Sequence, residues 1–334
     1  MLDTRTALAT ARLFMPAGVS DAAAAADLQR RVAAEWDELD AAARNWSQLG
    51  VDLPPTRGRV VGRMGWIRAN VATMVPISEM VAARLERSAP GASRVMSVQV
   101  GGLFGLLSTK VLGQYVLPLA GQGSGQLLIV GPNVLSLATE FGDVADDLRR
   151  SVLVHEIVHR LQFDGTGWLG QYLRDLLHEY VEATDLRPER VKELAARLPD
   201  ALREAVAASS PEPLMNAILT PPQQALMERA QGFMSLLEGH GNAAMSLGAA
   251  DVVHDPEAVR EALESRRGDL TSKVLTAVAG MDMKRRQYVD GEAFVRAVVE
   301  REGVDGLNRA FAEPANLPTL DEIADPAAWL QRTA

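Results

Sequence analysis

Two of the chain's five histidines, His155 and His159, lie four residues apart within the apolar run SVLVHEIVHRLQF of residues 151–163. On a helix, residues at this spacing are neighbours, with Cβ atoms roughly 5–6 Å apart. Both imidazoles can therefore reach one cation at the zinc–nitrogen distance of about 2.0–2.1 Å. Glu156 points about 100° further round the helix, where its carboxylate is poorly placed as a ligand but can reach a water on the metal. The HEIVH string thus predicts a helix that carries part of a zinc site.

The residues around this string predict that the helix is largely buried. Two imidazoles and a carboxylate buried without partners would cost several kcal/mol, and a metal ion would satisfy all three. A hydrogen-bonded histidine pair in a core, or a chance HExxH on a solvated helix, is the alternative; we favour zinc. The apolar flanking residues are Val152, Leu153, Val154, Ile157, Val158, Leu161 and Phe163.

A third protein ligand is expected, because catalytic zinc commonly binds three side chains and leaves one position for water. The metzincin pattern requires Gly at 162 and His at 165, and this chain has Gln162 and Gly165. A carboxylate from a later helix is therefore favoured. Glu179 has the sequence spacing found in gluzincins, whereas Glu238 lies in the apolar segment MSLLEGHGNAAM, where a lone acid needs a compensating cation. The residues alone leave both candidates open, and His240 is expected to contact the site without binding the ion.

Composition excludes several classes of protein. The chain has no cysteine, which rules out disulfides, thiolate zinc sites and cysteine nucleophiles. A net charge of −9 without a basic cluster argues against a nucleic-acid partner. The most apolar stretch, residues 95–119, is interrupted by Gln99 and Lys110, and the N-terminus has no signal-peptide pattern. We therefore expect a cytoplasmic protein with no membrane span.

The pattern along the chain predicts a mainly α (α+β) fold of zincin-like layout. Two short apolar runs, 114–119 and 126–130, flank the loop GQGSG and predict a β-hairpin before the HExxH helix. In zincins an edge strand beside the metal can hold an extended peptide; an ordinary ribbon is the alternative. Helices are expected at 20–49, 63–87 with a break at Pro76, 92–107, 144–162, 168–183, 187–207, 221–247, 256–265, 269–279 and 283–302.

The expected organisation is an N-terminal helical region (1–90), a zincin-like metal-site core (91–250) and a C-terminal helical region packed on that core (251–334). One continuous domain is the alternative.

An ordered set of segments resembles an actinobacterial group of zincin-like proteins regarded as hydrolases, some of them associated with biosynthesis of the deazaflavin coenzyme. The segments are residues 60–74, 111–115, 130–134, 155–169, 234–240, 283–299 and 317–330.

The resemblance implies a mainly helical zincin-like fold and singles out MSLLEGH, which favours Glu238 over Glu179 as the third ligand. Tyr288, in KRRQYVDGEAF, becomes a candidate oxyanion donor, with a core tyrosine as the alternative. Val116 and Ser246 stand where the family tends to carry acids that could orient the metal histidines.

Together these observations predict a zinc-dependent hydrolase, and more specifically a metallopeptidase of gluzincin type. His155, His159 and Glu238 would bind Zn²⁺, and Glu156 would act as general base on a peptide or small amide substrate. The alternative is a non-catalytic, metal-stabilised helical protein that serves as a binding or scaffold protein.

Overall fold

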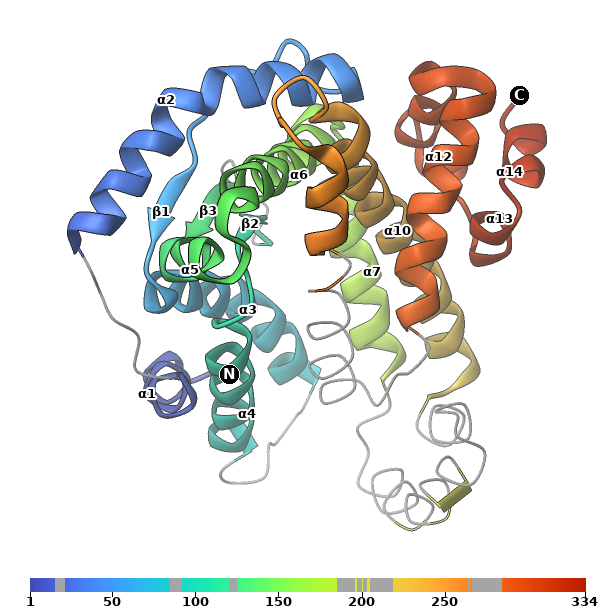
Figure 1. The fold of residues 1–334 in the computed structure, drawn as a ribbon. Helices are drawn as coiled ribbons and strands as arrows, with labels where there is room; N and C mark the ends of the chain where they lie inside the picture. Colours follow the sequence, from blue (N-terminus) through green and yellow to red (C-terminus); the bar gives the residue numbers. More distant parts are fainter. Residues whose placement is uncertain are drawn as a thin grey trace.

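The computed structural model describes residues 1–15, 22–84, 92–119, 125–184, 219–263 and 284–334, with the isolated residues 196, 200, 203, 204 and 265. Helices surround a small sheet and a long central helix, α6 (Ala145–Gly165) (Figure 1). The prediction of a mainly helical, zincin-like fold with a small sheet before the HExxH helix is confirmed. None of the described helices is both long and apolar enough to cross a bilayer.

The N-terminal part of the chain forms four helices. The expected helices at 20–49 and 92–107 are confirmed, and α1 was not expected from the pattern. The predicted break at Pro76 is wrong: α3 runs through it, because a proline without an N–H removes one backbone hydrogen bond while the turns on either side keep theirs. The helices are α1 (Thr4–Phe14), α2 (Ala22–Ser47), α3 (Arg63–Arg84) and α4 (Ala92–Leu107).

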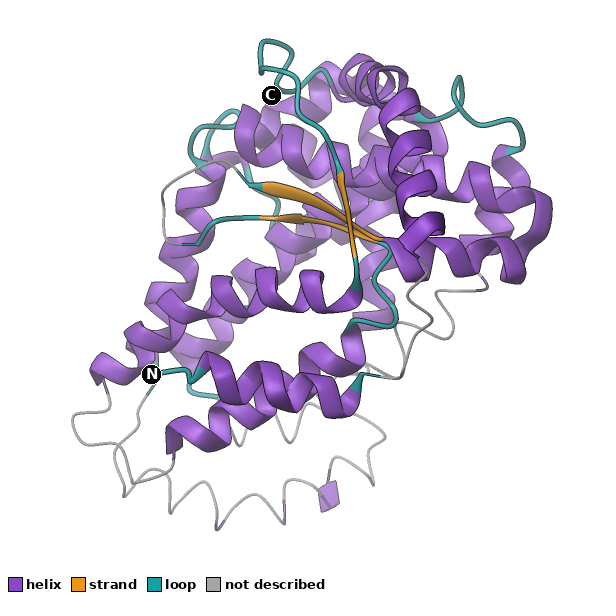
Figure 2. Ribbon diagram, turned by 90° about the vertical axis from the view of Figure 1, so that its left-hand side faces the viewer, coloured by secondary structure: helices purple, strands orange, loops and turns teal. Residues whose placement is uncertain are grey.

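Three strands form the sheet, in the order β1-β3-β2. Figure 2 shows the small sheet among the helices. β2 (Gly113–Val116) pairs antiparallel with β3 (Gln126–Val130), which confirms the predicted hairpin; residues 120–124 of its loop lie outside the described residues. β1 (Arg59–Val61), which was not predicted, pairs parallel with β3 on the other side.

Both faces of β3 are buried, which explains why its sequence is a continuous apolar run. Leu127 and Ile129 belong to a core cluster with residues of α2 and α6, whereas Leu128 and Val130 pack in a second cluster with residues of α1 and α3. The sheet therefore lies between two helical layers, with β2 at the edge that contacts α6.

The HExxH string lies on α6 (Ala145–Gly165), as predicted. This helix follows α5 (Gly131–Phe141) and a short 3₁₀ turn (Gly142–Val144), and it precedes α7 (Leu169–Ala183). Its apolar residues Leu153, Val154, Ile157, Val158 and Leu161 are all buried in the first cluster. The predicted burial of the helix is therefore confirmed.

The rest of the described chain packs beside α6 as a second helical group. α10 lies between α6 and α12, and the close contact with α12 is made at glycine: a Cβ on Gly239 would lie 2.3 Å from the backbone of Gly291. The predicted 221–247 helix is confirmed: α10 continues directly into a π-helical turn (Ala244–Gly248). Residues 256–263 are also helical. The elements are α10 (Pro221–Ala243), α12 (Lys284–Asn308), α13 (Leu320–Ala324) and α14 (Pro326–Arg332), with 3₁₀ turns at Arg309–Phe311 and Pro314–Asn316.

The predicted helices at 187–207 and 269–279 lie, for the most part, outside the described residues. The division into regions 1–90, 91–250 and 251–334 stays a prediction.

Candidate metal centre

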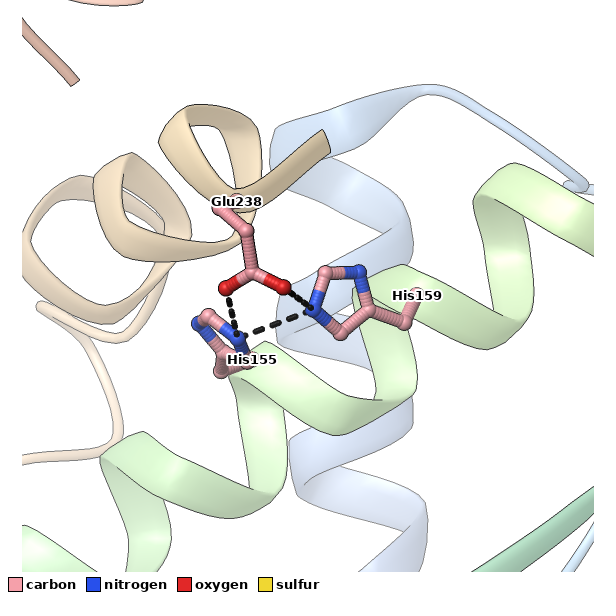
Figure 3. A group of neighbouring side chains, drawn as sticks. All are labelled: His155, His159 and Glu238. Atoms are coloured by element: carbon pink, nitrogen blue, oxygen red, sulfur yellow. Dashed lines mark hydrogen bonds and ion pairs between the residues drawn. The ribbon is translucent and has the colours of Figure 1, made fainter. Parts of the chain in front are cut away.

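Three predicted ligands come together where α6 meets α10 (Figure 3). The Nε2 atoms of His155 and His159 lie 2.9 Å apart. One carboxylate oxygen of Glu238 lies 3.7 Å from Nε2 of His155, and the other lies 3.7 Å from Nε2 of His159. The two histidines come from successive turns of one helix, whereas the glutamate is brought to them by a helix far along the chain.

This donor set fits a zinc ion. A tetrahedral ion with ligands at about 2.0–2.1 Å would hold its ligand atoms about 3.3–3.4 Å apart, and the observed separations of 2.9 and 3.7 Å fall on either side of that value. Two imidazole nitrogens and one carboxylate leave a fourth position for water or substrate, as in catalytic zinc sites.

Glu179, the other candidate ligand, is not brought to the histidines. It lies on α7, about half exposed, and its carboxylate accepts a 2.8 Å hydrogen bond from Nη1 of Arg229. The apolar setting of Glu238 was therefore a better guide to position than the sequence spacing of Glu179.

Glu156 lies between the histidine helix and the edge strand. It is 8% exposed, and its Oε2 accepts a 2.9 Å hydrogen bond from the backbone N–H of Tyr115 in β2. Burial raises the pKa of this carboxyl to about 7, an effect that the nearby His159 opposes and Glu238 reinforces. A group with such a pKa can both accept and release a proton near neutral pH.

The contact between Glu156 and β2 also concerns the prediction that this edge strand holds an extended peptide. The outward N–H of Tyr115 is used within the protein, by Glu156, instead of facing a further strand. The tyrosine hydroxyl donates to Asp164 of α6 and accepts a 3.2 Å hydrogen bond from the N–H of Gly125. β2 is thus held against the HExxH helix by both backbone and side chain.

Behind the histidines, a buried amide links the two ligand-bearing helices. Oε1 of Gln162 lies 2.8 Å from Nδ1 of His159. Nε2 of Gln162 lies 3.2 Å from the carbonyl oxygen of Leu237 and 2.8 Å from Nδ1 of His240. In the sequence, Gln162 only excludes the metzincin pattern. Nothing in the sequence alone indicates that its side chain contacts both α6 and α10.

His240 lies near the site without joining the ligands, as expected. Its ring is fully buried and packs on Trp46, with ring centroids 4.8 Å apart, and on Phe311 at 5.2 Å. Burial, and then the neighbouring His159 and His155, lower its pKa to about 3, so its imidazole is neutral near pH 7. Its contact with Gln162 places it behind the ligands.

His155 is supported differently from His159. Its Nδ1 is buried and has no hydrogen-bond partner among the residues that the structure describes. The ring lies against α10 at Gly241, where an added Cβ would come within 2.7 Å of Nδ1 and Cε1. Packing therefore positions this ring.

A cleft of about 430 Å³ opens in front of the three ligands. Three polar side chains from α3 and β2 line this cleft and bond to one another: the ring N–H of Trp66 and the amide of Asn70 both donate to Oε1 of Gln114, and Nε2 of Gln114 donates to Asn70. Elsewhere the described lining is mostly apolar. The apolar residues are Val111, Val116, Leu117, Leu119, Phe163, Leu173, Met234 and Leu237.

The remaining predicted positions contribute less to the site as described. The side chain of Tyr288 lies outside the described residues, so its predicted role stays a prediction. Val116 lines the cleft from β2. The hydroxyl of Ser246 lies 3.3 and 3.2 Å from the carbonyl oxygens of Asn242 and Ala243 and accepts from Arg296, so it is engaged with helix backbone and α12.

A helix with HExxH, a glutamate from a later helix and a cleft in front of them define the zincin class of metal site. A sequence model described as zincin-like metallopeptidase matches residues 2–330, and the chain therefore belongs to this family.

The fold is also similar to a solved structure. It matches a crystal structure from Chloroflexus aurantiacus described as that of "a putative hydrolase with a novel fold", with 26% sequence identity and a TM-score of 0.73 over 99% of this chain and 98% of that one. A comparison with curated proteins found no match. Family and neighbour support a zinc hydrolase in general, and the predicted links to actinobacteria and to the deazaflavin coenzyme stay predictions.

Proposed function

We propose that this protein is a zinc-dependent hydrolase of gluzincin type that cleaves peptide or small amide bonds. His155, His159 and Glu238 hold Zn²⁺, and Glu156 is the general base. The observation that carries the proposal is the grouping of one ligand atom from each of the three residues within 4.8 Å, beside a buried glutamate and facing a cleft. Membership of a zincin-like metallopeptidase family supports it.

Zinc, when bound, supplies a Lewis acid that polarises a carbonyl and lowers the pKa of water. Glu156 would take the proton from the attacking water and pass it to the leaving nitrogen. The backbone N–H of Tyr115 holds the carboxylate in place while it does so. Glu156 is buried beside a largely apolar cleft wall, a setting in which electrostatic interactions are stronger than in bulk water.

The first prediction concerns Glu156→Gln. Because an amide cannot accept the proton, hydrolysis should fall by about 10²–10⁴-fold while zinc content stays near one ion per chain. Zinc is measured by elemental analysis, and hydrolysis by mass spectrometry on a mixture of synthetic peptides. Glu179→Gln is the matched control, since that glutamate pairs with Arg229 away from the cleft, and it should change neither quantity.

Three outcomes would count against the proposal. A wild-type protein without stoichiometric zinc removes its basis, and so does a Glu156→Gln variant with unchanged hydrolysis. Bound zinc with no cleavage of any peptide or amide would instead favour the metal-stabilised binding or scaffold protein.

A further inference from the structure

The buried amide of Gln162 has only one consistent orientation. The side chain is fully buried, so water cannot complete its hydrogen bonds. One end of the amide lies 3.2 Å from the carbonyl oxygen of Leu237. A carbonyl can only accept a hydrogen bond, so that end must be the NH₂ group and the other end must be the oxygen.

This orientation determines the tautomer of His159. The amide oxygen lies 2.8 Å from Nδ1 of His159 and cannot donate, so Nδ1 must carry the proton. In a neutral imidazole the lone pair is then on Nε2. Nε2 is the atom that faces His155 and Glu238, at 2.9 and 3.7 Å. The amide therefore selects the form of His159 that can bind a metal through Nε2.

The same amide ties α6 to the helix that carries Glu238. The carbonyl it bonds belongs to the peptide group that joins Leu237 to Glu238. Its second hydrogen points to Nδ1 of His240, one turn away from Leu237 on α10, at 2.8 Å. One side chain thus contacts a ligand on α6 and the backbone next to a ligand on α10.

We propose that Gln162 is a positioning residue of the metal site: it selects the metal-binding tautomer of His159 and sets Glu238 opposite it. The inference rests on the proposed function, because it assumes that these residues bind zinc. Buried hydrogen-bond partners of metal-binding histidines commonly change metal affinity by about 10–100-fold when they are removed. His155, whose Nδ1 has no described partner, depends on packing for its orientation.

The test compares Gln162→Leu with Gln162→Glu and measures zinc affinity by competition with a chelator. Leucine removes every hydrogen bond of the amide, and we expect zinc affinity to fall by about 10–100-fold. Glutamate keeps an acceptor for Nδ1 of His159 but loses the donor to the carbonyl oxygen of Leu237, so it should keep the His159 tautomer while its zinc affinity also falls below that of the wild type. Gln171→Leu, on the exposed face of α7, is the control and should bind zinc like the wild type.

A second readout separates tautomer selection from general loss of structure. The ¹⁵N shifts of the histidine rings in the metal-free protein report which nitrogen carries the proton. His159 should be protonated on Nδ1 in the wild type and in Gln162→Glu, and should lose this preference in Gln162→Leu. Circular dichroism confirms that each variant is folded.

The inference is overturned if Gln162→Leu binds zinc within threefold of the wild type, or if its His159 keeps the proton on Nδ1. A wild type that binds no zinc contradicts the proposed function itself. Tight binding by the wild type together with an unaffected leucine variant contradicts only the role of Gln162.

Discussion

At the scale of single residues, two glycines make room for side chains of the site, because a Cβ atom at either position would clash with them. A Cβ on Gly113 of β2 would lie 2.8 Å from Cγ of Glu156, and a Cβ on Gly241 of α10 would lie 2.7 Å from the ring of His155. Contacts under 3.0 Å cannot be accommodated without movement. The catalytic carboxylate that we propose and one ligand are thus positioned partly by the absence of side chains on neighbouring elements.

Gly241→Ala should weaken zinc binding. The added methyl group meets Nδ1 and Cε1 of His155, and the ring must rotate or shift away from the ligand position it shares with His159. We expect zinc affinity, measured by chelator competition, to fall at least tenfold. Changes to the groups that hold metal-binding histidines in place commonly alter metal affinity by about 10–100-fold. Gly167→Ala, where nothing lies within 4 Å of the added Cβ, is the control. Equal zinc affinity of the two variants would show that the His155 ring can accommodate the added methyl group without leaving its ligand position.

At the scale of elements, the N-terminal part of α6 is tied to the segment after the π-helical turn. Asp147 is 8% exposed, and its Oδ2 accepts hydrogen bonds of 3.0 Å from the backbone N–H groups of His254 and Asp255. Burial acts to raise the pKa of this carboxyl, but hydrogen bonds from the side chain and backbone of His254 and from Asp255 outweigh it, so the net pKa lies below 3.8.

Asp147→Asn should destabilise the protein at neutral pH by about 1.5–3 kcal/mol, the range for hydrogen bonds to charged groups. A carboxyl whose pKa is lower in the folded state stabilises the fold above its unfolded pKa of about 3.8. That stabilisation disappears as the pH falls through the folded pKa. The difference from the wild type should therefore shrink as the pH falls below about 4.

Urea unfolding across this pH range measures the effect. Asp143→Asn, at an exposed position in the turn before α6, is the control and should stay within about 0.5 kcal/mol of the wild type. A deficit that grows as the pH falls below about 4 would contradict the role given to Asp147.

At the scale of the whole molecule, the metal site joins two helical groups. The histidines belong to α6, which packs with the sheet and α2, whereas Glu238 belongs to α10, which packs with α7 and α12. An ion bound to both helices would add a link between them that the unfolded chain lacks. Metal binding should therefore stabilise the folded state.

Zinc should raise the melting temperature of the metal-free protein. An ion present at about 100 times its Kd stabilises the folded state by ~2.7 kcal/mol, which corresponds to an increase of several degrees in a chain of this size. Glu238→Gln should show a much smaller increase, and Glu179→Gln should respond like the wild type. Calorimetry with zinc, and with magnesium as the non-binding ion, makes the comparison. An equal increase in all three proteins would place the stabilising ion elsewhere.

Features that depend on local sequence were predicted well. The HExxH helix, the alanine-rich α2 and the β2–β3 hairpin each follow from periodicity or turn residues within one segment. β1 was missed, because its three residues have no pattern of their own and pair with β3 only after the chain folds. The predicted break at Pro76 within the 63–87 helix is wrong, because the cost of one lost hydrogen bond does not outweigh the contacts of the rest of α3.

By itself, the amino-acid sequence determined the histidine pair and its acid on one buried helix, because a spacing of four residues sets the geometry wherever that helix lies. Only the tertiary structure decided that Glu238, and not Glu179, faces the histidines, and that Gln162 contacts both ligand helices. Both depend on which helix packs against α6. That packing comes from apolar surfaces contributed by many segments, and no local pattern contains it.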